Sequence, residues 1–136
     1  MDDFETIYKE TRYIVEDGRA DFTILLAGDN KAVHEFLTEA RAKTWAFLTA
    51  CNPFGGELSN LENARRQQTL ATILKSGDYE FYRGKGVGTD PAWQPEPSFF
   101  ILDISRDAAI QLAKRFEQNA ILWGSIDSPP ELVWCA

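Results

Sequence analysis

Residues 44–76, TWAFLTACNPFGGELSNLENARRQQTLATILKS, carry the signals that decide the fold. The apolar run of residues 44–50 predicts a buried strand, and the proline and glycines that follow end it. Ser59 and Glu62 have the spacing of a capping box, which satisfies free backbone amides at the start of a helix. The stretch therefore predicts a strand, a polar turn and a helix that ends near Ser76.

Further segments extend this pattern toward the C-terminus. Residues 79–84 and 98–104 read as strands, and Ser105 caps a second helix with an apolar stripe. Residues 120–126 predict another strand, and residues 131–135 a closing one. Together with the first strand and helix, these elements give the order β-α-β-β-α-β, which is the split βαβ order of ferredoxin-like folds.

The N-terminal part adds a hairpin and a short helix. Residues 11–27 contain two strand-like runs around Asp17-Gly18, a pair that is typical of hairpin turns. Residues 30–42 carry apolar side chains at helical spacing. We therefore expect a single α+β domain over residues 1–136, with a ferredoxin-like core that the β-hairpin and short helix extend or cover.

The composition limits the classes of function. The 21 acidic and 14 basic residues give a net charge of −7, which argues against a nucleic-acid binder because no positive surplus exists to neutralise phosphate. No apolar run is long enough to span a membrane. The acidic start, MDDFETIYKE, lacks the basic and apolar regions of a signal peptide. We expect a cytoplasmic protein that binds neither nucleic acid nor membrane.

Cysteine and histidine suggest little chemistry. Cys51 and Cys135 lie far apart in the sequence, and a disulfide between them is not expected in a reducing compartment. These two residues and His34 lack the spacing of metal ligands. Thr49, Ser59 and Cys51 have no evident base, because the one histidine of the sequence, His34, lies in another element. We expect no metal and no cofactor, and whether the protein is an enzyme stays open.

Polar residues gather at one end of the expected sheet. In a ferredoxin-like arrangement three segments meet there: residues 51–63, residues 84–97 and the end of the second helix at Gln118-Asn119. The same segments are rich in glycine, proline and asparagine. The sequence thus predicts a polar pocket at this end. Its candidate ligand-binding residues are Asn52, Ser59, Asn63, Arg66, Trp93, Glu96, Gln118 and Asn119.

The first helix places an arginine on its inward face. Counting back from the apolar positions of the helix puts Asn63, Arg66 and Gln67 on one stripe. An unpaired buried charge costs several kcal/mol, so Arg66 needs a partner, and Glu96 is our candidate. These polar side chains could bind a ligand or could tie down a long loop, and the sequence leaves both alternatives open.

Two glycine-containing segments invite comparison with phosphate sites. The run Gly84-Lys85-Gly86-Val87-Gly88 follows a strand and does not open a helix, so we interpret it as a flexible hairpin tip. The helix start after Gly55-Gly56 is a better anion site, although Glu57 and Glu62 would oppose a highly charged anion.

Several motifs together resemble those of a known bacterial family. In order they are Phe47–Pro53, Leu58-Ser59 with Glu62-Asn63 and Arg66, Gly84-Lys85-Gly86, Trp93 with Pro95–Ser98, and Gln118-Asn119-Ala120. From Thr11 to Val133 the chain is similar to the domain-of-unknown-function family 3293. The resemblance implies no particular activity, but its motifs fall on the converging segments and so favour a shared site. It also leads us to expect glycine where this chain has Asp103 and Glu117.

Two functions are compatible with these expectations. The first is binding of a small polar or anionic metabolite, such as a nucleotide, with charge from Arg66, hydrogen bonds from the asparagines and stacking on Trp93. Glu96 would orient Arg66 or, if a reaction occurs, act as a general base. The alternative is an acidic module that binds or inhibits a protein partner and whose polar cluster is structural. A homodimer is compatible with either.

Overall fold

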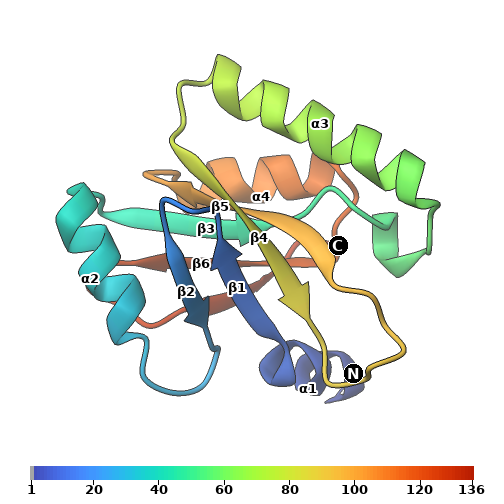
Figure 1. The fold of residues 1–136 in the computed structure, drawn as a ribbon, viewed down its shortest axis with the longest axis horizontal. Helices are drawn as coiled ribbons and strands as arrows, with labels where there is room; N and C mark the ends of the chain where they lie inside the picture. The colour runs from blue at the N-terminus through green and yellow to red at the C-terminus, as the bar shows by residue number, and fades with distance from the viewer. Residues whose placement is uncertain (1) are drawn as a thin grey trace.

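The computed structural model describes the backbone of residues 2–136 and the side chains of residues 5–136. These residues form four α-helices and one seven-stranded sheet (Figure 1). The α+β class is therefore confirmed. In chain order the elements are α1 (Asp2–Glu10), β1 (Arg12–Glu16), β2 (Asp21–Ile24), α2 (Lys31–Ala40), β3 (Thr44–Leu48), the 3-10 helix η1 (Pro53–Gly55), α3 (Asn60–Ser76), β4 (Phe81–Val87), β5 (Glu96–Leu102), α4 (Arg106–Arg115), β6 (Ala120–Ser125) and β7 (Glu131–Trp134).

The sheet has the strand order β2-β1-β4-β5-β3-β6-β7. Every neighbouring pair is antiparallel. β5 is the central strand, and β3 lies next to it, where its apolar run is buried between β5 and β6. The β1–β2 hairpin extends the sheet past β4, and β7 forms the opposite edge. None of the helices in the described part of the chain is long and apolar enough to cross a membrane.

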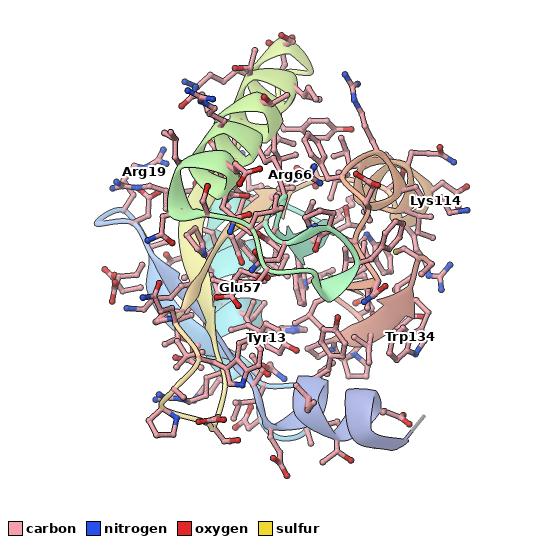
Figure 2. The ribbon with its side chains drawn as sticks, turned by 90° about the vertical axis from the view of Figure 1, so that its right-hand side faces the viewer. Tyr13, Arg19, Glu57, Arg66, Lys114 and Trp134 are labelled. Atoms are coloured by element: carbon pink, nitrogen blue, oxygen red, sulfur yellow. The ribbon has the colours of Figure 1, made fainter. Side chains whose placement is uncertain are left out.

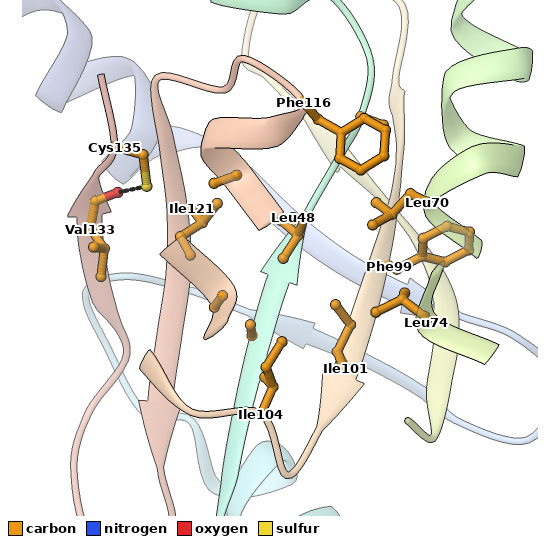
Figure 3. Close-up of a cluster of buried hydrophobic side chains, with 14 of the residues drawn as sticks. Leu48, Leu70, Leu74, Phe99, Ile101, Ile104, Phe116, Ile121, Val133 and Cys135 are labelled. Atoms are coloured by element: carbon orange, nitrogen blue, oxygen red, sulfur yellow. Dashed lines mark hydrogen bonds between the residues drawn. The ribbon is translucent and has the colours of Figure 1, made fainter. Parts of the chain in front are cut away.

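Helices α3 and α4 cover one face of the sheet (Figure 1). Because strand side chains alternate between faces, Leu48 of β3 and Ile101 of β5 point to this side. There they pack with Leu70 and Leu74 of α3 and with Ala109 of α4 (Figure 3). Burying a leucine side chain stabilises a fold by about 1.5–3 kcal/mol, so α3 is held mainly by its apolar C-terminal half.

An aromatic cluster fills the opposite face under α2. Trp45 and Phe100, the alternate residues of β3 and β5, stack with ring centroids 5.5 Å apart. Phe36 of α2 lies 5.2 Å from the Tyr82 ring of β4. This cluster joins α2 to the centre of the sheet, whereas α1 lies apart from α2, near the loop between β4 and β5 (Figure 1).

The glycine-rich segment after residue 83 is a strand and not a hairpin tip, which corrects our expectation. β4 continues through Val87 and pairs with both β1 and β5. A Cβ atom on Gly84 would lie 2.5 Å from the carbonyl oxygen of Ile14 and 2.9 Å from the Phe47 ring. Glycine is therefore required here by close packing of the sheet.

Two residues that we expected to be glycine adopt the left-handed backbone conformation. Asp103 has φ 52° and Glu117 has φ 57°. Glycine adopts this conformation without steric cost, whereas other residues lose roughly 1 kcal/mol. The backbone explains why glycine would suit both positions. In this chain Asp103 and Glu117 adopt the left-handed conformation without being glycine.

Candidate functional site

Asn52, in the turn between β3 and α3, organises the polar end of the sheet. Its Oδ1 accepts hydrogen bonds from the Leu58 backbone N–H (3.0 Å) and from Asn63 Nδ2 (2.8 Å). Its Nδ2 donates to Glu96 Oε2 at 3.0 Å. Asn63 Oδ1 in turn accepts from the Asn52 backbone N–H at 2.9 Å. The structure thus brings Asn52, Asn63 and Glu96 together, and the bonds fix the orientation of the Asn52 amide.

Arg66 has different partners from the one that we predicted. Its Nε donates to the Ala50 carbonyl and its Nη2 to the Phe116 carbonyl, both at 2.6 Å. Its Nη1 lies 3.6 Å from Glu117 Oε1. The prediction of Glu96 as partner is therefore wrong. The Phe116 carbonyl at the C-terminal end of α4 carries partial negative charge, and together with the Ala50 carbonyl after β3 it satisfies the guanidinium in place of Glu96.

Two glutamines complete the connection between the turn and α4. Gln118 Nε2 donates to the Cys51 carbonyl at 2.9 Å and to the Phe116 carbonyl at 3.0 Å. Gln67, which was not among our candidate residues, accepts from the Ala50 backbone N–H at 2.8 Å. Every buried side-chain nitrogen and oxygen in the described residues has a hydrogen-bond partner. With Arg66, these glutamines hold residues 50–52 in place.

Ser59 acts as the N-cap of α3. Its Oγ accepts from the Glu62 backbone N–H at 3.1 Å, and the Glu62 carboxylate accepts from the Ser59 backbone N–H at 3.3 Å. Both halves of the capping box are present, so this prediction is confirmed. The Ser59 hydroxyl is therefore engaged at the start of the helix.

Two hollows open at the polar end, and Asn52, Trp93 and Glu96 line both of them. The first hollow, of about 600 Å³, lies between α1, the loop between β4 and β5, the turn after β3 and the connection from α4 to β6. The second, of about 860 Å³, lies between that turn, the first half of α3 and residues 92–97. Figure 2 is a view onto this end, with Tyr13 above α1 and Trp134 beside it.

The eight candidate residues divide between these hollows. The first hollow is lined by five of them, which are Asn52, Trp93, Glu96, Gln118 and Asn119. Ser59 and Asn63 line only the second hollow. Arg66 lines neither: in Figure 2 it lies beside α3, across the 51–59 segment from Tyr13.

Our reasoning from sequence missed two tyrosines of the first hollow. Tyr8 belongs to α1, which we did not predict, and Tyr13 lies on β1. The Tyr13 hydroxyl donates to the Tyr8 carbonyl at 2.7 Å and so ties α1 to the sheet. Tyr13 is two residues before the buried Val15, and this alternation was the signal that could have placed it on an inner face.

Burial controls the ionisation of the groups around the first hollow. It raises the pKa of the half-buried Glu96 carboxyl, an effect that the Asn52 hydrogen bond partly offsets. Burial also raises the pKa of Tyr8, and the negative charge of Glu96 adds to that rise. The pKa values of Tyr13 and Cys51 are raised for the same main reason. The phenols and the thiol are thus neutral near pH 7, which leaves Glu96 as the titratable group of interest.

The two cysteines are buried and free. Within residues 5–136, no three histidine, cysteine, aspartate or glutamate side chains lie close enough together to hold a metal ion. Burial raises the pKa of Cys135 as well, so neither thiol has the lowered pKa of an activated nucleophile. The chemistry available at the polar end is therefore that of carboxylate, amide and aromatic groups.

The fold and the site define a class: an α+β protein with a hollow between aromatic and amide side chains at one end of its sheet. A family model described as "Protein of unknown function (DUF3293)" matches residues 48–121, just over half of the chain. The chain therefore belongs to this family. The match runs from the end of β3 into β6 and includes all eight candidate residues. No curated protein and no solved structure matches the chain.

Proposed function

We propose that the protein binds a small molecule in the first hollow. The observation that carries this proposal is the hollow itself: segments far apart in the sequence surround about 600 Å³. Small-molecule sites commonly have volumes of roughly 300–1,000 Å³, apolar or aromatic walls and a few polar groups. Tyr8, Tyr13 and Phe47 supply such walls, and Asn119 and Glu96 supply polar groups.

The topology of the sheet supports placing a site here. The strand order β4-β5-β3-β6, with α3 and α4 on one face, supports interpreting the part from residue 44 as a ferredoxin-like core. In such a core the end of the first strand, the loop between the second and third strands and the end of the second helix meet. The first hollow is lined from these same three places.

Three side chains are suited to contact a ligand. The Asn119 side chain makes no hydrogen bond to any described residue, and the same is true of Glu96 Oε1. Trp93, in the loop between β4 and β5, is 67% exposed. An exposed indole at the edge of a hollow offers a stacking face for a planar or apolar group.

The charges around the hollow favour a neutral or cationic molecule over the anionic metabolite or nucleotide that we expected from the sequence. Glu96 and Asp90 line the hollow, and no lysine, arginine or histidine among residues 5–136 does so. Arg66, the expected source of positive charge, is engaged by backbone carbonyls. An anion in the hollow would therefore meet repulsion without compensation.

A thermal-shift screen with a blocking variant tests the proposal. The compounds would be amines, nucleosides, sugars and amino acids. Thr89 is an exposed residue that lines the first hollow, so Thr89→Trp places a bulky ring at its edge. Thr23→Trp, at an exposed position of β2, is the matched control. Ligand at about 100 times its dissociation constant stabilises a protein by roughly 2.7 kcal/mol.

We expect one compound class to raise the melting temperature of the wild type and of Thr23→Trp saturably. The rise should be absent or much smaller in Thr89→Trp, because the added ring competes for the same space. A screen in which no class stabilises the wild type would contradict the proposal. The alternative expectation, an acidic module that binds a protein partner, would then be the next hypothesis.

A further inference from the structure

We propose that the ligand carries an ammonium group that binds the Glu96 carboxylate, while the rest of the ligand lies among the aromatic rings of the first hollow. This inference rests on the proposed binding function and names the charge and the chemical class of the ligand. It depends on three features of the hollow: a carboxylate held in place, the absence of a protein cation beside it, and aromatic walls.

The Glu96 carboxylate is positioned by a hydrogen bond to only one of its oxygens. Asn52 Nδ2 donates to Oε2 at 3.0 Å, and no described residue donates to Oε1. Asn52 cannot turn away freely, because Leu58 N–H and Asn63 Nδ2 both donate to its own side-chain oxygen. The turn thus holds the carboxylate through Oε2, and Oε1 can accept a hydrogen bond from a ligand in the hollow.

Asp17 is a buried carboxylate that, unlike Glu96, is paired with cations from the described part of the chain. Asp17, whose side chain is 6% exposed, lies 2.8 Å from Arg19 Nε and 3.6 Å from Arg83 Nε. Glu96 is half-buried, and no lysine or arginine of residues 5–136 forms an ion pair with it. A buried carboxylate without a cation is costly for the fold. A bound ammonium group would supply the missing charge.

Aromatic rings provide the second half of the recognition. Tyr8 and Tyr13 line the first hollow from α1 and β1, and Trp93 lines it from the loop between β4 and β5. Ring faces attract cations and also bury the carbon chain or ring of a ligand. Burial raises the pKa of Glu96, and an adjacent ammonium group would oppose that rise because opposite charge favours the ionised carboxylate.

Three probes of nearly equal shape test the inference: phenethylamine as the cation, 2-phenylethanol as the neutral compound and 3-phenylpropanoate as the anion. Their affinities would be measured by calorimetric titration at millimolar concentration near neutral pH. The variant Glu96→Gln removes the charge but keeps an acceptor for Asn52. The control, Glu39→Gln, makes the same change at an exposed position of α2.

We expect phenethylamine to bind about tenfold more tightly than 2-phenylethanol, and 3-phenylpropanoate to bind most weakly. In Glu96→Gln the amine and the alcohol should bind equally, whereas Glu39→Gln should keep the wild-type preference. A melting temperature at least equal to that of the wild type would show that Glu96→Gln is folded. If that variant does not fold, Glu96→Asp, which withdraws the carboxylate by one methylene group, should lose most of the preference.

Equal binding of the amine and the alcohol, tighter binding of the anion, or a preference that persists in Glu96→Gln would overturn the inference. Each of these results would leave the proposed binding function intact. Absence of binding by all three probes would also overturn the inference. The proposed function would then be judged separately, by the wider screen with Thr89→Trp.

Discussion

The side-chain amide of Asn52 donates a hydrogen bond of 3.0 Å to Glu96 and joins the turn after β3 to the start of β5. Both residues line both hollows, so this contact forms part of the wall between them. Arg66 and Gln118 donate to backbone carbonyls and hold the turn, and so form the structural part of the polar end. Glu96 lines the first hollow, where we propose that the ligand binds.

Arg66→Met tests the structural part. The change removes the donors to the Ala50 and Phe116 carbonyls and keeps most of the apolar length of the side chain. We expect the free energy of unfolding to fall by about 2 kcal/mol, because the Ala50 carbonyl loses its side-chain donor and the Phe116 carbonyl keeps only Gln118. The melting temperature should fall by several degrees. Thermal melts would measure this, with Arg65→Met at an exposed position of the same helix as control.

Any ligand-induced stabilisation should persist in Arg66→Met, because Arg66 lines neither hollow. An unchanged melting temperature would contradict the structural role of Arg66. A folded variant that no longer responds to the ligand would show that Arg66 acts in binding.

Glu96→Gln should stabilise the ligand-free protein at neutral pH. Because the pKa of Glu96 is raised in the fold, the ionised carboxylate costs stability. This cost is absent below the ordinary glutamate pKa of about 4.3, grows as the pH rises through the folded pKa and is complete above it. The variant removes the cost and keeps the contact with Asn52. Thermal melts over a range of pH should show that Glu96→Gln is more stable than the wild type near pH 7 and equally stable at about pH 4.

The matched change Glu39→Gln should have little effect at any pH. A Glu96→Gln variant that is less stable than the wild type at neutral pH would indicate that the charge of Glu96 has a structural role. It would contradict the idea that Glu96 serves ligand binding and lowers the stability of the fold.

Asp17 should contribute stability that is lost in acid. Arg19 and the Arg83 backbone N–H hold the pKa of Asp17 down to about 2. The ionised form is therefore favoured in the fold, so the contribution is complete above the ordinary aspartate pKa and disappears as the pH falls toward 2. We expect Asp17→Asn to cost about 1–2 kcal/mol at neutral pH. Its denaturation curve should converge with that of the wild type in acid.

Asp127→Asn, a change at an exposed position, is the control for Asp17 and should be nearly neutral. If Asp17→Asn proved equally neutral at pH 7, the contacts with Arg19 and Arg83 would contribute nothing measurable.

Gly84→Ala tests whether the glycine-rich segment serves packing. A Cβ atom would approach the Ile14 carbonyl to 2.5 Å and the Phe47 ring to 2.9 Å, so β1 or Phe47 would have to move. We expect a loss of roughly 1–3 kcal/mol in chemical denaturation. At Gly88 a Cβ atom meets nothing within 4 Å, and Gly88→Ala should be tolerated. Equal stability of the two variants would refute the packing explanation.

The fold was predictable where the signals are local. The capping box of Ser59 and Glu62, the apolar run of β3 and the Asp17-Gly18 turn each specify a short segment, and all three elements form as expected. α1 was missed because its sequence, DDFETIYKE, is mostly polar and because the ring of Tyr8 packs against Trp134 of β7, which is far away in the sequence. The end of β4 was missed because glycine usually indicates a loop, whereas here it permits close approach of β1.

The location of the polar end could also be predicted, but its contacts could not. Composition and topology identified the segments that meet there, and five of the eight candidate residues line the first hollow. The partners of Arg66 could not be predicted from composition and topology, because they are backbone carbonyls, which every residue has. The charge of the hollow depends on which side chains point into it, and that required the packed structure.

The most direct measurement is an NMR titration of the isotope-labelled protein with the compound that stabilises it most in the screen. We predict saturable shifts at the Trp93 indole, the Asn119 side-chain amide and the Gly86 backbone amide, all of which line the first hollow. The indole of Trp45, which is 1% exposed and does not line this hollow, should change little. Shifts centred on α2 or on the exposed face of α3, or no saturable shift with any compound, would contradict a binding site in this hollow.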